Sequence, residues 1–260
     1  EKPVKGQVTG KGKQEVTPKP AEEKERPKFD SLTLEVFNSQ GIKIRTLKEK
    51  LGDDNGFGRM YWTLNEKAPR YPSRNKPMAG APEPGGNQVL PGTYKLRLSA
   101  GGYKDSVQLV VKPDPRFNVP VGVYQSRYEL LKELDGLTSI SSRAADRIRE
   151  SLDLVGDFEK KMETSKREDL KEALAKTKAM KDSLNVLMDF LLGKEDKRQG
   201  FAPPIAPTPV SYIGVAQMYV ATSKDPVGAT DERVMQHARV QIRQAIDRIN
   251  AFYRKEWTPY

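Results

Sequence analysis

Apolar and polar residues alternate most clearly over residues 90–111. A Pro91-Gly92 corner opens a run in which every second residue is apolar, and Gly101-Gly102 separates it from the β-rich run Val107–Val111. Two alternating runs joined by a short glycine loop predict a β-hairpin with one buried face. We expect this hairpin to close a small β-sandwich.

The same period of two appears earlier in the chain. Leu32–Phe37 and Ile42–Leu47 alternate on either side of the turn residues 38–41, and Gly58–Leu64 is a third predicted strand. Trp62 is the largest core candidate, expected to be buried against Leu34, Val36, Tyr94 and Leu96. Residues 68–86 are rich in proline and glycine without periodicity, which is typical of a functional or mobile loop.

After residue 116 the apolar period changes to three and four. One stripe runs from Leu130 to Met162 in phase across Gly136, which predicts a single helix of about 40 residues. Ser165 and Glu168 have the spacing of a capping box, so a second helix should start there and end at Gly193.

Prolines interrupt the helical pattern over residues 201–209. Thr208 can cap a short helix that has Pro209 in its first turn and ends near Ala221. Thr230-Asp231-Glu232 supplies a cap and an acidic first turn for the last helix. Three long stripes joined by short links predict an antiparallel three-helix bundle.

The predicted fold class is therefore α+β with several domains. Residues 1–28 contain hardly any apolar side chain and are expected to be a flexible linker or strap. Residues 29–116 form the predicted β-sandwich, and residues 117–260 form the predicted helical bundle.

Charge and composition restrict the function classes. The chain of 260 residues has a formal net charge of +10, but basic and acidic residues alternate, as in Lys194–Arg198. Such mixed runs indicate solvated faces and do not favour a nucleic-acid partner. The chain has no cysteine, so disulfides and thiolate metal sites are excluded. No apolar run reaches the roughly 20 residues of a membrane-spanning helix.

No residue pattern predicts catalysis or a cofactor. His237 is the single histidine, so no Ser/His/Asp or Cys/His constellation and no paired Glu-x-x-His site can be built around it. Asp53–Gly56 lacks the spaced carboxylates of a calcium loop and is expected to be a turn. We predict no catalytic residue, no metal ligand and no cofactor site.

Several segments together resemble a known family. Residues 34–41, 44–47, 58–64 and 91–116 resemble the C-terminal region of bacterial sortilin-type, Asp-box β-propeller proteins, often labelled glycosyl hydrolases. The similarity extends over residues 27–257. The first three segments also resemble the immunoglobulin-like fold of the flagellar hook-capping protein and of surface-protein sorting domains. The chain contains no Asp-box, so no catalytic residue of that family transfers to it.

The resemblance implies an immunoglobulin- or fibronectin type III-like sandwich and a place in the periplasm, on the outer-membrane surface or outside the cell. It also implies a non-catalytic accessory or docking module. The partner would be a protein, namely a β-propeller that precedes this region in the same polypeptide or belongs to a partner chain. The expected interface anchors are Phe201, Ile205, Tyr212 and Tyr219.

Three alternatives remain open at the level of sequence. The short helix near these anchors could instead cap the bundle and bury them internally. The chain could be the C-terminal part of a hydrolase-like protein whose active site lies in a propeller outside it. It could also be a carbohydrate-binding module that uses the aromatic residues Tyr61, Trp62, Tyr71 and Tyr103.

Overall fold

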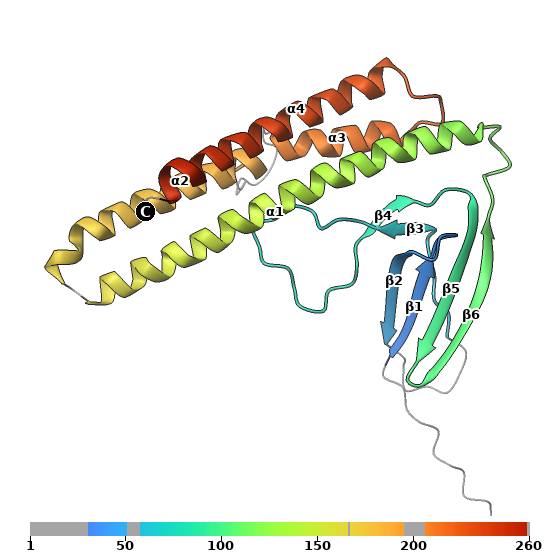
Figure 1. Cartoon of the computed structure of the whole chain (residues 1–260), viewed down its shortest axis with the longest axis horizontal. Coiled ribbons are helices and arrows are strands. Elements are labelled where there is room, and N and C mark those ends of the chain that lie inside the picture. The colour runs from blue at the N-terminus through green and yellow to red at the C-terminus, as the bar shows by residue number, and fades with distance from the viewer. Residues whose placement is uncertain (1–30, 51–57, 166, 195–205, 259–260) are drawn as a thin grey trace, which may run out of the picture.

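The structure is a computed structural model that describes residues 31–50, 58–165, 167–194 and 206–258. Within these residues a small antiparallel sheet region is followed by helices, as predicted (Figure 1). The predicted linker 1–28 and the predicted anchors Phe201 and Ile205 lie outside the described residues.

Four strands form the main sheet in the order β2-β1-β5-β6, and every neighbouring pair is antiparallel. The predicted hairpin is confirmed, because β5 and β6 pair from Gly92↔Val111 to Ala100↔Tyr103 around Gly101, which has a φ of 55°. A second, two-stranded sheet consists of β3 and β4. The strands are β1 (Ser31–Phe37), β2 (Lys43–Lys50), β3 (Asn65–Lys67), β4 (Gly85–Gln88), β5 (Gly92–Ala100) and β6 (Tyr103–Val111).

The sheet has one apolar face, and only part of it is covered. Val36 on β1 and Tyr94 on β5 are buried there with Val89, and Trp62 packs against them. A buried face was also predicted for the outer hairpin strand, and this prediction is wrong, because β6 is exposed up to Val110. The reason is position: β6 is a sheet edge, whereas the small core lies over β1 and β5.

The predicted strand over residues 58–64 is also wrong. These residues are irregular, and regular pairing begins only at Asn65. Leu64 has a φ of 54°, a left-handed conformation that interrupts an extended chain. Trp62 is half-buried, donates from Nε1 to the Asn65 carbonyl at 2.8 Å, and meets Tyr94 edge-on at 5.6 Å. The second layer is therefore short, and a complete sandwich is not confirmed.

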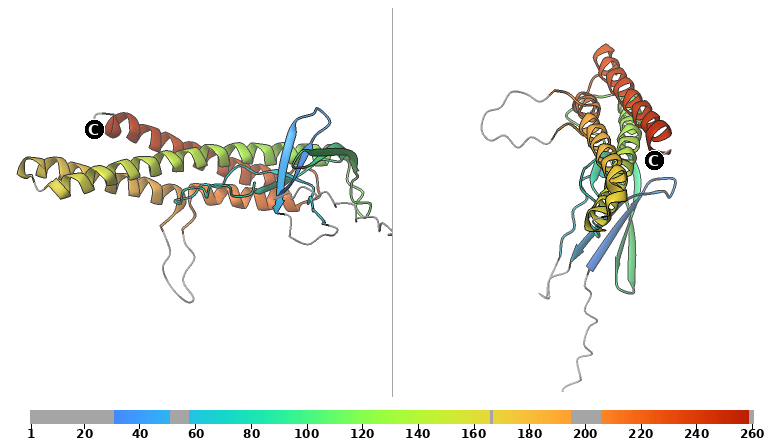
Figure 2. Two further views of the ribbon diagram at one scale, coloured as in Figure 1. Left: turned by 90° about the horizontal axis from the view of Figure 1, so that it is seen from below. Right: turned by 90° about the vertical axis from the view of Figure 1, so that its left-hand side faces the viewer.

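The helices follow the apolar stripes closely. They are α1 (Val121–Ser165), α2 (Lys171–Leu192), α3 (Pro209–Thr222) and α4 (Ala229–Phe252), with a 3-10 turn at Glu168–Leu170 and a π turn at Tyr253–Trp257. The long first helix is confirmed and is continuous through Gly136. Helices α2 and α3 follow one another along α1, while α4 runs beside them in the opposite direction (Figures 1 and 2).

Two of the three predicted helix starts differ in detail. The capping box at Ser165 is wrong, because this residue ends α1 and its hydroxyl donates to the Met162 carbonyl. Thr208 with Pro209 is confirmed as the start of α3. At α4 the residue before the helix is Gly228, whose amide donates to the Asp231 carboxylate, so Thr230 lies inside the helix and is not its cap.

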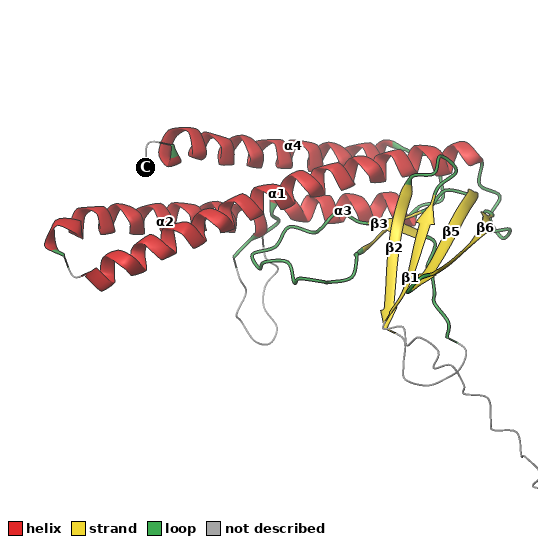
Figure 3. Ribbon diagram, turned by 60° about the horizontal axis from the view of Figure 1, so that its bottom comes forward, coloured by secondary structure: helices red, strands yellow, loops and turns green. Residues whose placement is uncertain are grey.

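The loop between β3 and β4 ties the sheet to the helices. These residues, 68–84, which we call the β3–β4 loop, extend along α1 while the main sheet projects away near the start of that helix (Figure 3). Arg74 donates to Asp189 of α2 at 2.7 Å, and Arg149 of α1 donates at 3.3 Å to the carbonyls of Ser73 and Asn75. Arg70 pairs with Asp146 of α1. The aperiodic loop predicted from sequence is thus clamped by ion pairs.

Gly86 of β4 allows a close backbone approach that no other residue permits. A Cβ there would lie 2.8 Å from the Ala68 nitrogen and 3.0 Å from the Glu66 carbonyl oxygen. We expect Gly86→Ala to lower the free energy of unfolding in urea by about 1–3 kcal/mol. Gly102→Ala is the control, because nothing lies within 4 Å of its Cβ. Equal costs for the two variants would contradict the close approach.

Candidate functional site

Helix α3 stands out because it contains no charged residue in its 14 positions. Its start is well determined: Thr208 Oγ1 accepts from the Ser211 amide, and Ser211 Oγ accepts from the Thr208 amide. One side of the helix is buried in the cluster formed with α1 and α4, through Ile213, Ala216 and Val220.

The opposite side of α3 is apolar as well. Val215, Met218 and Tyr219 are 44%, 58% and 44% exposed. Their spacing of three and four residues places them on one side of the helix, which we call the α3 outer face. An exposed apolar cluster on a helix that also has a buried apolar side is typical of a contact surface.

The predicted anchors fall into different environments. Tyr219 lies on the α3 outer face, in keeping with an interface anchor. Tyr212 is half-buried and packs into the core, where its ring meets that of His237 edge-on at 6.2 Å. Met218 and Val215 were not named as anchors from sequence. The signal that could have identified them is the lack of any charge on the solvent side of this helix.

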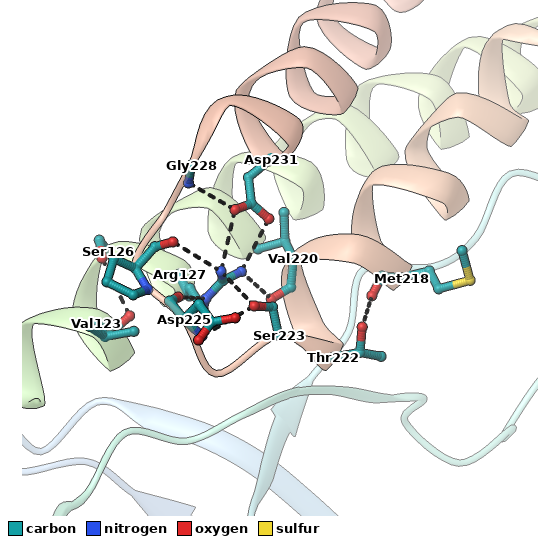
Figure 4. Close-up of polar contacts among 11 residues, drawn as sticks. Val123, Ser126, Arg127, Met218, Val220, Thr222, Ser223, Asp225, Gly228 and Asp231 are labelled. Carbon is teal, nitrogen blue, oxygen red and sulfur yellow. Dashed lines mark hydrogen bonds and ion pairs between the residues drawn. The ribbon is translucent and has the colours of Figure 1, made fainter. Parts of the chain in front are cut away.

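The C-terminal end of α3 is held by a buried arginine. Arg127 of α1 donates to the Val220 carbonyl at 3.1 Å, to Ser223 Oγ at 2.9 Å and to the Asp225 carbonyl at 2.7 Å (Figure 4). It also pairs with both carboxylate oxygens of Asp231, at 3.2 and 3.3 Å. This single side chain therefore joins α1, the end of α3 and the start of α4.

The charge state of Asp231 follows from the same contacts. Burial would raise the pKa of this carboxyl, but the Gly228 amide and the Arg127 guanidinium stabilise its charged form, and the pKa is lowered overall. Asp231 is thus a charged cap that fixes the turn between α3 and α4. Arg127 and Asp231, with their backbone contacts, therefore hold the turn behind the α3 outer face, and we call this arrangement the Arg127 frame.

A second polar cluster joins α1 to the small sheet. Tyr128 donates to Glu66 Oε1 at 2.5 Å, and Lys132 Nζ lies 3.1 Å from Glu66 Oε2 and 3.6 Å from Asp135 Oδ2. Asn87 of β4 donates to Asp135 at 2.9 Å. Burial raises the pKa of both Tyr128 and Asp135. Each of these groups is engaged across the junction, so the cluster orients the sheet on α1.

The four aromatic candidates for carbohydrate binding do not form one platform. Tyr61 precedes β3, Tyr71 belongs to the β3–β4 loop beside the helices, and Tyr103 begins β6 at the far end of the sheet (Figure 1). These three rings are exposed, whereas Trp62 is packed against Tyr94. A sugar-binding site that uses all four is not supported by this arrangement.

Neither a metal-binding cluster nor a membrane-spanning helix is present within the described parts of the chain. No three His, Cys, Asp or Glu side chains gather there as a metal site. Over the same residues, no helix combines the length and apolar character needed to span a membrane. Comparisons with models of protein families, with curated proteins and with solved structures find no match.

Proposed function

We propose that this chain is a non-catalytic docking module that binds another protein through the α3 outer face. The observation that carries the proposal is a helix without charge whose second apolar side is exposed. Aromatic residues and methionine are enriched in interfaces, and burying them supplies much of the binding energy. The frame around Arg127 reduces the ordering cost, because the turn after α3 is held before a partner arrives.

The proposed partner is a β-propeller, either earlier in the same polypeptide or on a partner chain. This part of the proposal rests on the resemblance of residues 34–41, 44–47, 58–64 and 91–116 to the C-terminal region of Asp-box propeller proteins. A location in the periplasm, on the outer membrane or outside the cell belongs to the same proposal. So does the finer fold: an immunoglobulin- or fibronectin-like sandwich, and a three-helix bundle in which α2 and α3 together act as the second helix.

The test places two negative charges on the α3 outer face. In the Val215→Asp/Met218→Asp variant we expect binding to the propeller to fall at least about tenfold, because two carboxylates would have to be desolvated. The thermal midpoint should change little, since surface substitutions cost within about 0.5 kcal/mol. Binding is measured by calorimetry with the propeller of the native polypeptide or of its partner chain.

The matched control is Asn185→Asp/Val186→Asp on the exposed side of α2, which adds the same charge. This control should bind as the unaltered chain does. If the α3 variant binds normally, docking through α3 is wrong. If the thermal midpoint of the α3 variant falls instead, the α3 outer face belongs to the core of the helical part.

A further inference from the structure

The face of the main sheet opposite its apolar core carries basic side chains from three of its four strands, β2, β5 and β6. The register Leu34↔Leu47 and Leu34↔Leu98 places the odd-numbered residues of β1 together with the even-numbered residues of β2 on that face. Lys43 joins them because the register shifts after Val36 and pairs Lys43 with Phe37. The same face receives the odd positions of β5 and the even positions of β6. We call it the basic sheet face, and its basic residues are Lys43, Lys48, Lys50, Lys95, Arg97 and Lys104, all of them exposed.

One carboxylate of the described strands stands among these cations. Glu35 accepts from Lys43 Nζ at 3.1 Å and from Arg97 Nε at 2.9 Å. Hydrogen bonds from Arg97 and Lys43 lower its pKa, so it stays charged. Within the described residues, no carboxylate ion-pairs with Lys48, Lys95 or Lys104, so the face carries an excess of positive charge.

A hollow of about 390 Å³ lies at one end of this face. Its lining includes Lys95 and Arg97 and the hydroxyl and amide side chains of Ser39, Thr93, Asn38 and Gln108. Phe37, Gly41 and Tyr94 complete the lining. Cations next to neutral hydrogen-bonding groups fit a ligand that has both negative charges and many hydroxyls. The rest of the face repeats this mixture, since Thr33, Thr46, Ser99 and Ser106 lie between the cations.

The aromatic content of the face separates the possible polyanions. Phe37 is half-buried, and the Arg97 guanidinium lies 4.8 Å from its ring centre. Single-stranded nucleic acids are bound by open aromatic rings on which bases stack, and Phe37 does not offer that surface.

We propose that the basic sheet face binds an acidic polysaccharide, a chain of sugars that carry carboxylate or sulfate groups. The acidic groups pair with Lys95, Arg97 and Lys48, and sugar hydroxyls enter the hollow. Neighbouring strands lie about 4.8 Å apart, and residues on the same face of one strand lie about 7 Å apart, so the cations recur at short intervals across the face. This site is separate from the α3 outer face and requires no propeller.

The test uses two polyanions, heparin and polygalacturonate, with neutral dextran as a negative probe. For the Lys48→Glu/Lys95→Glu variant we expect the Kd for both polyanions to rise at least about tenfold, since two attractive contacts become repulsive. Binding should weaken as salt is added. The matched control is Lys160→Glu/Lys161→Glu near the far end of α1, which changes the net charge equally at exposed positions.

The control should keep the Kd of the unaltered chain within about twofold. Equal losses in both variants would mean that net charge alone attracts the polymers, and the proposal would be wrong. It would also be wrong if single-stranded DNA or anionic lipid vesicles bound as tightly and with the same dependence on Lys48 and Lys95. Circular dichroism melting checks that both variants are folded.

Discussion

Replacing Arg127 by methionine is expected to lower the free energy of unfolding by about 3–5 kcal/mol. The side chains of Arg127 and Asp231 are only 8% and 11% exposed. The substitution would therefore leave a buried carboxylate unpaired and remove the donors from the carbonyls of Val220 and Asp225. Urea denaturation followed by circular dichroism at 222 nm measures the effect.

A second arginine of the helical part is the control. Arg239 of α4 pairs with Glu133 of α1 at 2.6 Å, but both side chains are about 40% exposed. Exposed pairs contribute little, so Arg239→Met should cost less than about 1 kcal/mol. Adding Asp231→Asn to the Arg127→Met variant should recover part of the loss. If the two arginine variants cost the same, Arg127 does not hold the frame behind α3.

Trp62→Ala is expected to cost about 3 kcal/mol, the lower end of the range for large aromatic residues, because the ring is only half-buried. The substitution removes the contact with Tyr94 and the hydrogen bond to Asn65, which together hold the irregular segment over the sheet. The decrease is measured as a shift of the urea midpoint reported by residues of the sheet, for example by NMR.

The neighbouring Tyr61→Ala is the matched control, because Tyr61 is 72% exposed and its loss should change stability by about 0.5 kcal/mol or less. The same pair of variants tests the carbohydrate-module alternative. If Trp62→Ala leaves the urea midpoint unchanged and abolishes glycan binding, Trp62 is a sugar-binding residue and not part of the core.

The sequence pattern predicted well those elements that are stabilised by residues close to them in the sequence. The hairpin at Gly101-Gly102 and the long helix through Gly136 are present, because a glycine turn and a periodic stripe act over a few residues. The segment at Gly58–Leu64 shows the limit. Its alternation is that of a strand, but the turn at Leu64 and the bond from Trp62 to Asn65 give it an irregular path.

The candidate surfaces divide in the same way. Residues 209–222 have a composition that marks an unusual helix, and the sequence predicts both Tyr212 and Tyr219 as interface anchors. Tyr219 is exposed, whereas Tyr212 is half-buried against the core. A helix of continuous apolar character does not reveal which side its neighbours cover. Only the positions of α1 and α4 decided that Val215 and Met218 are exposed.

The sequence by itself determined that strands are followed by helices along the chain and how α3 begins. Only the tertiary structure decided which side chains meet. The β3–β4 loop is anchored by pairs such as Arg74–Asp189. The basic sheet face gathers cations from β2, β5 and β6, which are separated in sequence by turns and loops. Along the chain these cations alternate with other residues and suggest solvated surface. Strand register sorts them onto one face, because side chains two apart point the same way and paired residues share a side.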